Sequence, residues 1–181
     1  MKIFRIILTT LGAFLIVGGL FSWYIGFFKT IKIKEKEDGD YRIIGLKTTG
    51  SYSVTGKSML NVEEILKKFG ISTKKEFGIY YDNPEVTPAK NCRSYVGAIL
   101  EEKDFDRISE LVSDGLEVDT VEKTKTVIAE FPLRNALSYM VGAMKVYPLL
   151  SKYMKEKNYT CKLTMEIYDL QNKKIIYMMH Y

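Results

Sequence analysis

The amino-acid sequence predicts an α+β protein in which an N-terminal transmembrane helix precedes a duplicated β-α-β-β module. The strands of both halves are expected to form one antiparallel sheet, with the two main helices on one face. Three observations predict this fold: an uncharged run of 23 residues near the start, strand and helix patterns that recur in the same order, and two similar strand motifs. With 181 residues, the chain has room for one ordinary domain and a short appendage.

The uncharged run extends from Ile6 to Phe28 and predicts a membrane anchor. As a helix it would be about 34 Å long, which is enough to cross the hydrocarbon core of a bilayer. Trp23 and Tyr24 lie near its end, shortly before Lys29, as in the aromatic belt of a membrane helix. A secretory signal peptide is the alternative, but no A-x-A-like cleavage site ends the run. Residues 1–30 are therefore interpreted as a single-pass transmembrane anchor with its flanks.

The net charge of +5 comes entirely from residues 1–36, which contain and flank the membrane run. The rest of the chain carries equal numbers of basic and acidic side chains, which alternate and form no basic block. Nucleic acid is therefore not an expected partner, because phosphate backbones are bound by clustered Lys and Arg. Four lysines follow the run and two basic residues precede it, so the positive-inside rule favours a cytoplasmic C-terminal domain.

Few residues have the chemistry of a metal or catalytic site. The two cysteines, Cys92 and Cys161, lack zinc-ligand spacing and are expected to be buried thiols. The single histidine, His180, is next to the end of the chain and is expected to fray. No phosphate-binding glycine loop, dinucleotide fingerprint or nucleophile elbow is present. The sequence therefore predicts neither a metal nor a cofactor.

The first half of the domain has the pattern strand, helix, strand, strand. Residues 31–40 are polar and end in Asp-Gly-Asp, so they are interpreted as a linker or as a strand leading from the membrane. Residues 41–52 are strand-like, and residues 58–70 carry apolar side chains at helical spacing. Residues 76–82 and 92–100 are rich in aromatic and β-branched side chains, which predicts two further strands.

The second half repeats this order after a short predicted helix at residues 104–115. Residues 124–131 predict a strand, and residues 133–157 predict a long helix that Pro148 should kink. The core stripe expected on this helix consists of Leu137, Met140, Val141 and Met144. Residues 163–170 and 173–181 then predict the last two strands.

Two short motifs indicate that the halves are repeats. FGIYYD ends at Asp82 and TMEIYD ends at Asp169, 87 residues later, and each follows the helix of its half. The motifs are expected to occupy equivalent positions in one domain of residues 41–181. If both helices cover one face of the sheet, the other face is expected to be left for a ligand.

Three segments resemble the GyrI-like small-molecule-binding domains. GIYYDNPEVTPAKNCRSYVGAIL, from Gly78 to Leu100, resembles the GIYYD-x-P motif of that family, and residues 130–157 and 165–171 are similar to its second helix and following strand. The resemblance covers residues 41–181 and implies an effector-type domain that binds small molecules. Within the family, the combination of an N-terminal membrane helix with this domain most resembles the membrane-anchored ER-phagy-receptor type. That type acts through a long disordered tail, which is not expected here because the sequence ends directly after the last strand.

Glu166 is predicted to be central to the ligand site. Side chains two residues apart on a strand face the same way, so Glu166 and Tyr168 share a face of the sheet. The resemblance implies that a glutamate of the E-x-Y type lies in the ligand pocket, where it would attract a cation or act as a base. Tyr81 and Tyr95 are predicted to add aromatic walls suited to stacking and cation-π contacts. The alternatives are a solvated Glu166 and tyrosines that belong to the core.

These observations lead to three functional interpretations. The first is a membrane-anchored module that binds a small, apolar and potentially cationic molecule between two pseudo-repeats. The second is a hydrolase of small electrophilic molecules with Glu166 as base. The third is a membrane-tethered platform that binds an unidentified protein. The first interpretation implies a small-molecule partner, no catalysis, and membrane contact through residues 6–28.

Overall fold

The computed structural model describes residues 2–181 and contains four α-helices, eight strands and three short 3-10 turns in that range. The helices are α1 (Lys2–Tyr24), α2 (Thr55–Lys68), α3 (Ile108–Ser113) and α4 (Leu137–Glu156). The strands are β1 (Ile33–Asp38), β2 (Tyr41–Thr49), β3 (Lys75–Tyr80), β4 (Arg93–Ile99), β5 (Glu117–Val121), β6 (Thr124–Pro132), β7 (Leu163–Asp169) and β8 (Lys174–His180). The predicted α+β class is confirmed.

All eight strands belong to one antiparallel sheet with the order β1-β6-β8-β7-β3-β4-β2-β5. The two halves of the chain meet in the centre, where β3 pairs with β7 and Gly78 lies opposite Glu166. Each half contributes three strands in the same relative order, and β1 and β5 add one edge strand to the opposite half. The junction between the halves is therefore the middle of the sheet.

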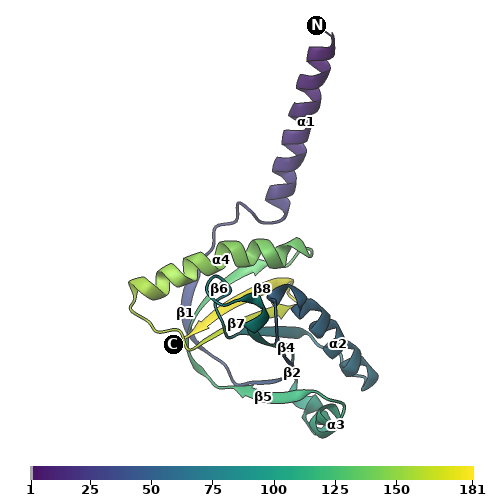
Figure 1. Cartoon of the computed structure of the whole chain (residues 1–181), viewed down its shortest axis with the longest axis vertical. Coiled ribbons are helices and arrows are strands. Elements are labelled where there is room, and N and C mark those ends of the chain that lie inside the picture. Colours follow the sequence, from purple (N-terminus) through teal and green to yellow (C-terminus); the bar gives the residue numbers. More distant parts are fainter. Residues whose placement is uncertain (1) are drawn as a thin grey trace.

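Helices α2 and α4 lie on the same face of this sheet, α2 over β2 and β4, and α4 over β6 and β8 (Figure 1). The opposite face was expected to be free for a ligand, and this expectation is wrong. Its side chains form a closed apolar cluster that includes Phe77, Tyr95 and Met165, each fully buried. The sheet curls, so strands from both of its ends, β2, β5 and β6, contribute to this one cluster. The large cleft described below lies on the helical face instead.

The segment expected to be a linker or a strand forms β1, which pairs with β6 from Ile33 to Asp38. Five of the six residues of this strand are charged, which suits its position at the edge of the sheet but gives no apolar strand pattern in the sequence. Glu35 faces the C-terminal end of α4, where the Tyr153 hydroxyl donates a hydrogen bond to it over 2.8 Å. This bond lowers the pKa of Glu35. β1 thus helps to hold α4 over the sheet.

The core stripe predicted for α4 is largely wrong. Val141 is buried, but Leu137, Met140 and Met144 are 40%, 56% and 70% exposed. The buried side is instead formed by Ser138, Val141, Gly142, Val146, Leu150 and Met154. Apolar residues surround most of this helix, so their spacing alone could not show which side packs on the sheet.

The 87-residue offset between FGIYYD and TMEIYD is also wrong as a structural equivalence. On β7, Glu166 and Tyr168 face the helices, whereas Met165 and Ile167 face the opposite cluster. An offset of 87 aligns Glu166 with Ile79, which faces the opposite cluster. On β3, Tyr80 faces the helices as Glu166 does, so an offset of 86 matches the faces of these two strands, whereas a shift by one residue reverses every side chain.

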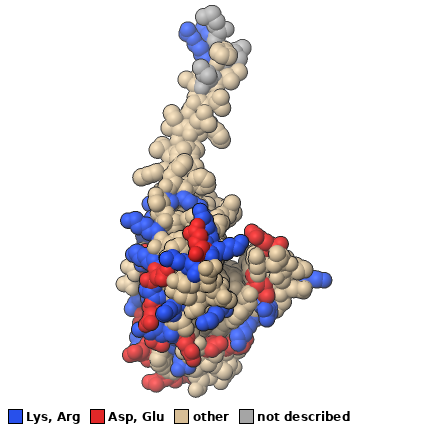
Figure 2. Space-filling model, turned by 90° about the vertical axis from the view of Figure 1, so that its left-hand side faces the viewer, with Lys and Arg blue, Asp and Glu red and all other residues tan. Residues whose placement is uncertain are grey.

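Helix α1 leaves the domain from the side on which α4 lies (Figure 1). Ile25, just after α1, is buried in the core cluster that contains Val141. The Arg134 guanidinium donates to the carbonyl of Tyr24, and the Lys145 ammonium donates to the carbonyl of Phe27. Basic side chains lie at both ends of the otherwise uncharged α1 (Figure 2). The end of α1 is therefore attached directly to α4.

We expect Gly142→Ala to destabilise the domain by about 1–3 kcal/mol, because a Cβ there would overlap the Tyr177 hydroxyl and lie 3.0 Å from Phe131 Cδ1. Gly56→Ala in α2 is the matched control, since a Cβ at that position has no neighbour within 4 Å. The control should be neutral or gain up to about 1 kcal/mol from helix propensity. Denaturant unfolding in detergent would measure both changes. Equal effects of the two substitutions would contradict the close packing of α4.

Candidate functional site

A large cleft lies between α2 and α4, above the centre of the sheet, with a volume of about 1690 Å³. Helix α2 contributes one wall with Met59 and Leu60, and α4 contributes the other with Ala143 and Tyr147. Strands β3 and β7 form the floor, so the cleft lies at the junction of the two halves. Its lining of aromatic and apolar side chains with a few polar groups is typical of a small-molecule site, and its volume exceeds the usual range of about 300–1,000 Å³.

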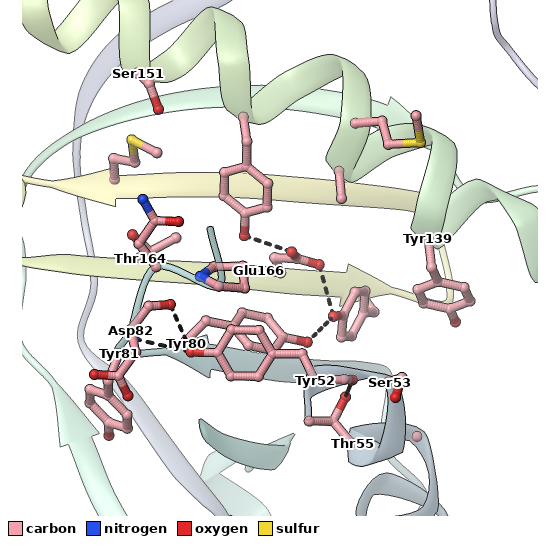
Figure 3. A pocket seen from close by; sticks show the side chains of 18 of the residues that line it. Tyr52, Ser53, Thr55, Tyr80, Tyr81, Asp82, Tyr139, Ser151, Thr164 and Glu166 are labelled. Carbon is pink, nitrogen blue, oxygen red and sulfur yellow. Dashed lines mark hydrogen bonds between the residues drawn. The ribbon is translucent and has the colours of Figure 1, made fainter. Parts of the chain in front are cut away.

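Glu166 lies on the floor of this cleft and is 6% exposed. Its carboxylate accepts two hydrogen bonds: Oε1 from the Tyr147 hydroxyl at 2.6 Å, and Oε2 from the Tyr168 hydroxyl at 2.8 Å. The hydroxyls of Tyr168 and Tyr80 lie 3.0 Å apart, which extends the network to β3 (Figure 3). Hydrogen bonds to a charged acceptor are stronger than neutral ones, so this network holds the carboxylate in one position.

Local structure explains how these four side chains meet. Tyr168 follows Glu166 by two residues on β7, so both point towards the helices. Tyr147 reaches the floor from α4, and Tyr80 comes from the neighbouring strand β3. Gly78 is required here, because a Cβ at this position would lie only 2.8 Å from the Tyr80 hydroxyl oxygen. The missing side chain gives the Tyr80 ring the space to cross the floor.

Burial dominates the protonation equilibria in the cleft. It raises the pKa of Glu166 above the ordinary value of 4.5, although the hydrogen bonds from Tyr147 and Tyr168 oppose this change. Burial also raises the pKa of Tyr80 to about 12, and the charge of Glu166 adds to the effect. The pKa of Glu76, also on the floor, is raised by burial and by the charge of Glu63. Low polarity around two carboxyl groups favours either a proton or a bound cation.

The charges that line the cleft are mostly negative. Among the described residues it contains five acidic side chains, Glu63, Glu76, Asp82, Glu85 and Glu166, and one basic side chain, Lys155. Lys67 neutralises Glu63, and Arg93 neutralises Asp82. Within residues 2–181, neither Glu166 nor Glu76 forms an ion pair. The floor of the cleft therefore carries carboxyl groups without a countercharge.

Two of the four predicted binding residues do not lie beside Glu166. Tyr81 is at the rim and turns away from the floor, with the Arg93 guanidinium 5.8 Å from its ring centre (Figure 3). Tyr95 is fully buried on the opposite face, where its hydroxyl donates to the carbonyl of Glu117 at 2.6 Å. The structure thus places Glu166 and Tyr168 in the cleft, Tyr81 at its margin and Tyr95 in the core. Tyr80, one residue before Tyr81, occupies the position expected for Tyr81.

Two tyrosines of α4 also line the cleft and were not among the predicted binding residues. Tyr139 and Tyr147 are eight residues apart, with Ala143 between them, and all three line the cleft. Residues four apart lie on one side of a helix, so the spacing of these three residues in the sequence already indicated that they share one side of α4. The Tyr139 ring also packs edge-on against Tyr168, with 5.1 Å between ring centres. The aromatic wall is therefore built by a helix as well as by strands.

The remaining candidate residues do not form a second chemical centre. Cys92 is buried as expected, whereas Cys161 is exposed and lines the cleft. His180 does not fray: it is buried in β8, with Nδ1 2.9 Å from the Thr124 hydroxyl. Pairing of β8 with both β6 and β7 keeps this end of the chain ordered. Within the described part of the chain, no group of three metal-ligating side chains is found.

The family model of the GyrI-like small-molecule-binding domain matches residues 30–174, which include the whole cleft floor. The chain belongs to this family. The family that the strand motifs predicted is thereby confirmed.

The curated relatives include testis-expressed protein 264 from mouse and human. The mouse protein is 32% identical over 124 residues and the human protein 31% identical over 125, in each case 66% of this chain. The resemblance to a particular type within the family is thus confirmed at the level of sequence. This chain spans 38% of the length of each of these relatives.

Among solved structures, the C-terminal domain of EcmrR is similar in fold. It superposes with a TM-score of 0.58 over 83% of this chain and 96% of that domain. The sequence identity is 11%, so this likeness supports the fold alone.

We expect the stability difference between the wild-type chain and Glu166→Gln to depend on pH. Glu166 is protonated in both states at low pH, so its ionisation then costs no stability. As the pH rises above 4.5, the carboxyl ionises more readily in the unfolded state, because burial raises its pKa in the fold. The wild type should therefore lose stability relative to the variant until the pH passes this raised pKa, by about 1.4 kcal/mol for each unit of elevation. Unfolding curves between roughly pH 4 and pH 8 would measure the difference; a constant difference would contradict a raised pKa.

Proposed function

We propose that this protein is a membrane-anchored GyrI-like module that binds a small apolar cation in the cleft between α2 and α4. The observation that carries the proposal is the Glu166 carboxylate, which Tyr147 and Tyr168 hold on the cleft floor without a countercharge among the described residues. A cation near Glu166 would offset the cost of ionising it in a place of low polarity.

The aromatic side chains around Glu166 favour the same ligand class. Tyr52, Tyr80, Tyr139, Tyr147 and Tyr168 all line the cleft. Their rings offer apolar contact area and a negative face, which attracts organic cations. Apolar residues of α2, such as Met59 and Leu60, provide further contacts for the uncharged part of the ligand. The combination fits an amine or quaternary ammonium compound with a bulky apolar group.

Binding accounts for the geometry better than hydrolysis by Glu166. A general base must hold an attacking water beside a substrate, and no further group that would orient a water is hydrogen-bonded to Glu166 among the described residues, whose partners there are Tyr147 and Tyr168. A platform for a protein partner would not need an open cleft of this volume. We therefore place ligand binding first among the three functions.

The proposed anchor is α1. Among the described helices, it has the length and composition to cross a bilayer, over Phe4–Tyr24. None of its described side chains is buried along this stretch, as expected for a helix in contact with lipid. In this proposal the soluble domain begins with β1 and lies on the cytoplasmic side, as the flanking lysines favour.

We also infer that the two halves are repeats of one ancestral module. The relative strand order β2-β4-β3 in the first half matches β6-β8-β7 in the second, and each half adds an edge strand to the other. In such a repeat the ligand site lies at the pseudo-symmetric junction, where β3 and β7 pair.

We expect α1 to remain attached in the mature protein and to keep the chain in the membrane fraction after high-salt and alkaline washing. The physical reason is the cost of exposing an uncharged helix to water. Fractionation with N-terminal sequencing would test this prediction. A processed N-terminus beyond Phe28 in the soluble fraction would identify a signal peptide instead.

We expect Glu166→Gln to weaken binding of a lipophilic cation by about 1–3 kcal/mol, or roughly 5- to 150-fold in Kd, because it removes a charged partner and preserves shape. Tetraphenylphosphonium is a suitable probe, and triphenylphosphine oxide is a neutral compound of related shape. The neutral compound should bind both proteins equally. Glu64→Gln is the matched control, since Glu64 is exposed on α2 and does not line the cleft.

Isothermal titration of the detergent-solubilised full chain would measure these affinities. In the wild type, affinity for the cation should rise with pH as Glu166 ionises, and the Gln variant should lack this rise. Equal cation affinities of wild type and Glu166→Gln would exclude Glu166 from the site.

A further inference from the structure

We propose that the outer face of α4 rests on the membrane surface as a second membrane contact, next to the transmembrane helix. This inference relies on the proposed insertion of α1. The outer face comprises Leu137, Met140, Met144, Lys152 and Lys155, which point away from the sheet and are exposed. The occupant is a lipid surface with anionic headgroups.

The first argument is the position of α4 relative to the end of α1. Ile25 packs in the same core cluster as Val141 of α4. Lys145 donates to the carbonyls of Phe27 and Lys29, the latter at 2.9 Å. These contacts hold α4 close to the level at which α1 would leave the bilayer. Figure 1 shows α4 as the element of the domain beneath α1.

The second argument is the exposure of apolar side chains on α4. Met140 and Met144 are one helical turn apart and 56% and 70% exposed, and Leu137 is 40% exposed. Phe27 and Phe28, which follow α1, are exposed near the same end of the domain. An exposed apolar row of this kind is costly in water, but it can insert into the boundary between headgroups and acyl chains.

The third argument is charge. Helix α4 contains no acidic residue before Glu156, whereas Lys145, Lys152 and Lys155 lie on it. Arg134 precedes it and is exposed, beside the end of α1. An apolar row flanked by basic side chains is the pattern of an interfacial helix that contacts anionic lipid. Helix α2 differs, because its exposed side carries Glu64 as well as lysines.

The contact has a consequence for the ligand site. Met144 and Lys155 belong to the outer face of α4 and also line the cleft. The mouth of the cleft therefore lies beside the headgroups, and an apolar cation dissolved in the bilayer could reach Glu166 along α4.

The test uses the full chain in vesicles of phosphatidylcholine and phosphatidylglycerol, with a Cys161→Ser background. A cysteine is introduced by Met144→Cys and labelled with an environment-sensitive fluorophore, while the remaining thiol, Cys92, is buried. Parallel vesicles carry a lipid-attached quencher either near the headgroups or deep in the acyl chains. Val112→Cys on α3 is the matched control, because Val112 is 43% exposed on an element far from α1 (Figure 1). Phe14→Cys in α1 reports whether the anchor is inserted. Each substituted side chain is exposed, so folding should be preserved, as melting temperatures would verify.

We expect the label at position 144 to be quenched several-fold more than the label at position 112. Omitting phosphatidylglycerol should reduce the quenching at position 144. Equal weak quenching at 144 and 112, with strong deep quenching at 14, would overturn the α4 contact and leave the anchor intact. No quenching at 14 would overturn the anchor and the contact together. Energy transfer between labels at 144 on two copies, without lipid quenching, would assign the face to a second copy of the chain and also overturn the proposal.

Discussion

The burial of one carboxylate, that of Glu166, is the constraint on which the organisation of this domain depends. Moving an ionised carboxylate into a place of low polarity costs several kcal/mol unless hydrogen bonds replace its water. The hydroxyls of Tyr147 and Tyr168 supply two such bonds. One donor comes from α4 and the other from β7, so the position of the helix over the sheet and the chemistry of the site are linked.

This link explains several features that would otherwise be separate. Gly78 lies opposite Glu166 in the central strand pair, and its missing side chain makes room for Tyr80. Gly142 brings α4 close to Tyr177 in the sheet below, which places the helix near enough for Tyr147 to reach the floor. The result is a carboxylate that is held before any ligand arrives. Preorganisation of this kind reduces the cost of ordering the site on binding.

The sequence was informative where local periodicity decides the outcome and failed where tertiary packing decides it. Strand alternation correctly put Glu166 and Tyr168 on one face, and helical spacing correctly located α2 and α4. The offset of 87 residues misplaced Tyr81, because similarity between the motifs does not show which residues of β3 and β7 face the same side of the sheet. Tyr95 is a tyrosine on a strand, as the cleft residues Tyr80 and Tyr168 are, so its sequence context does not distinguish it from them. Its packing against Phe77 shows that it belongs to the core. Which side of α4 is buried depends on the positions of α1 and the sheet, and the local sequence pattern of α4 does not contain this information.

The most direct test of the account is the pKa of Glu166 itself, followed by NMR of the ¹³C-labelled carboxyl group with and without tetraphenylphosphonium. We expect a pKa above 4.5 in the free protein and a clear decrease when the cation binds, because the positive charge favours the ionised carboxylate. An unshifted pKa that does not respond to a bound cation would contradict the claim that Glu166 is the charged centre of the ligand site.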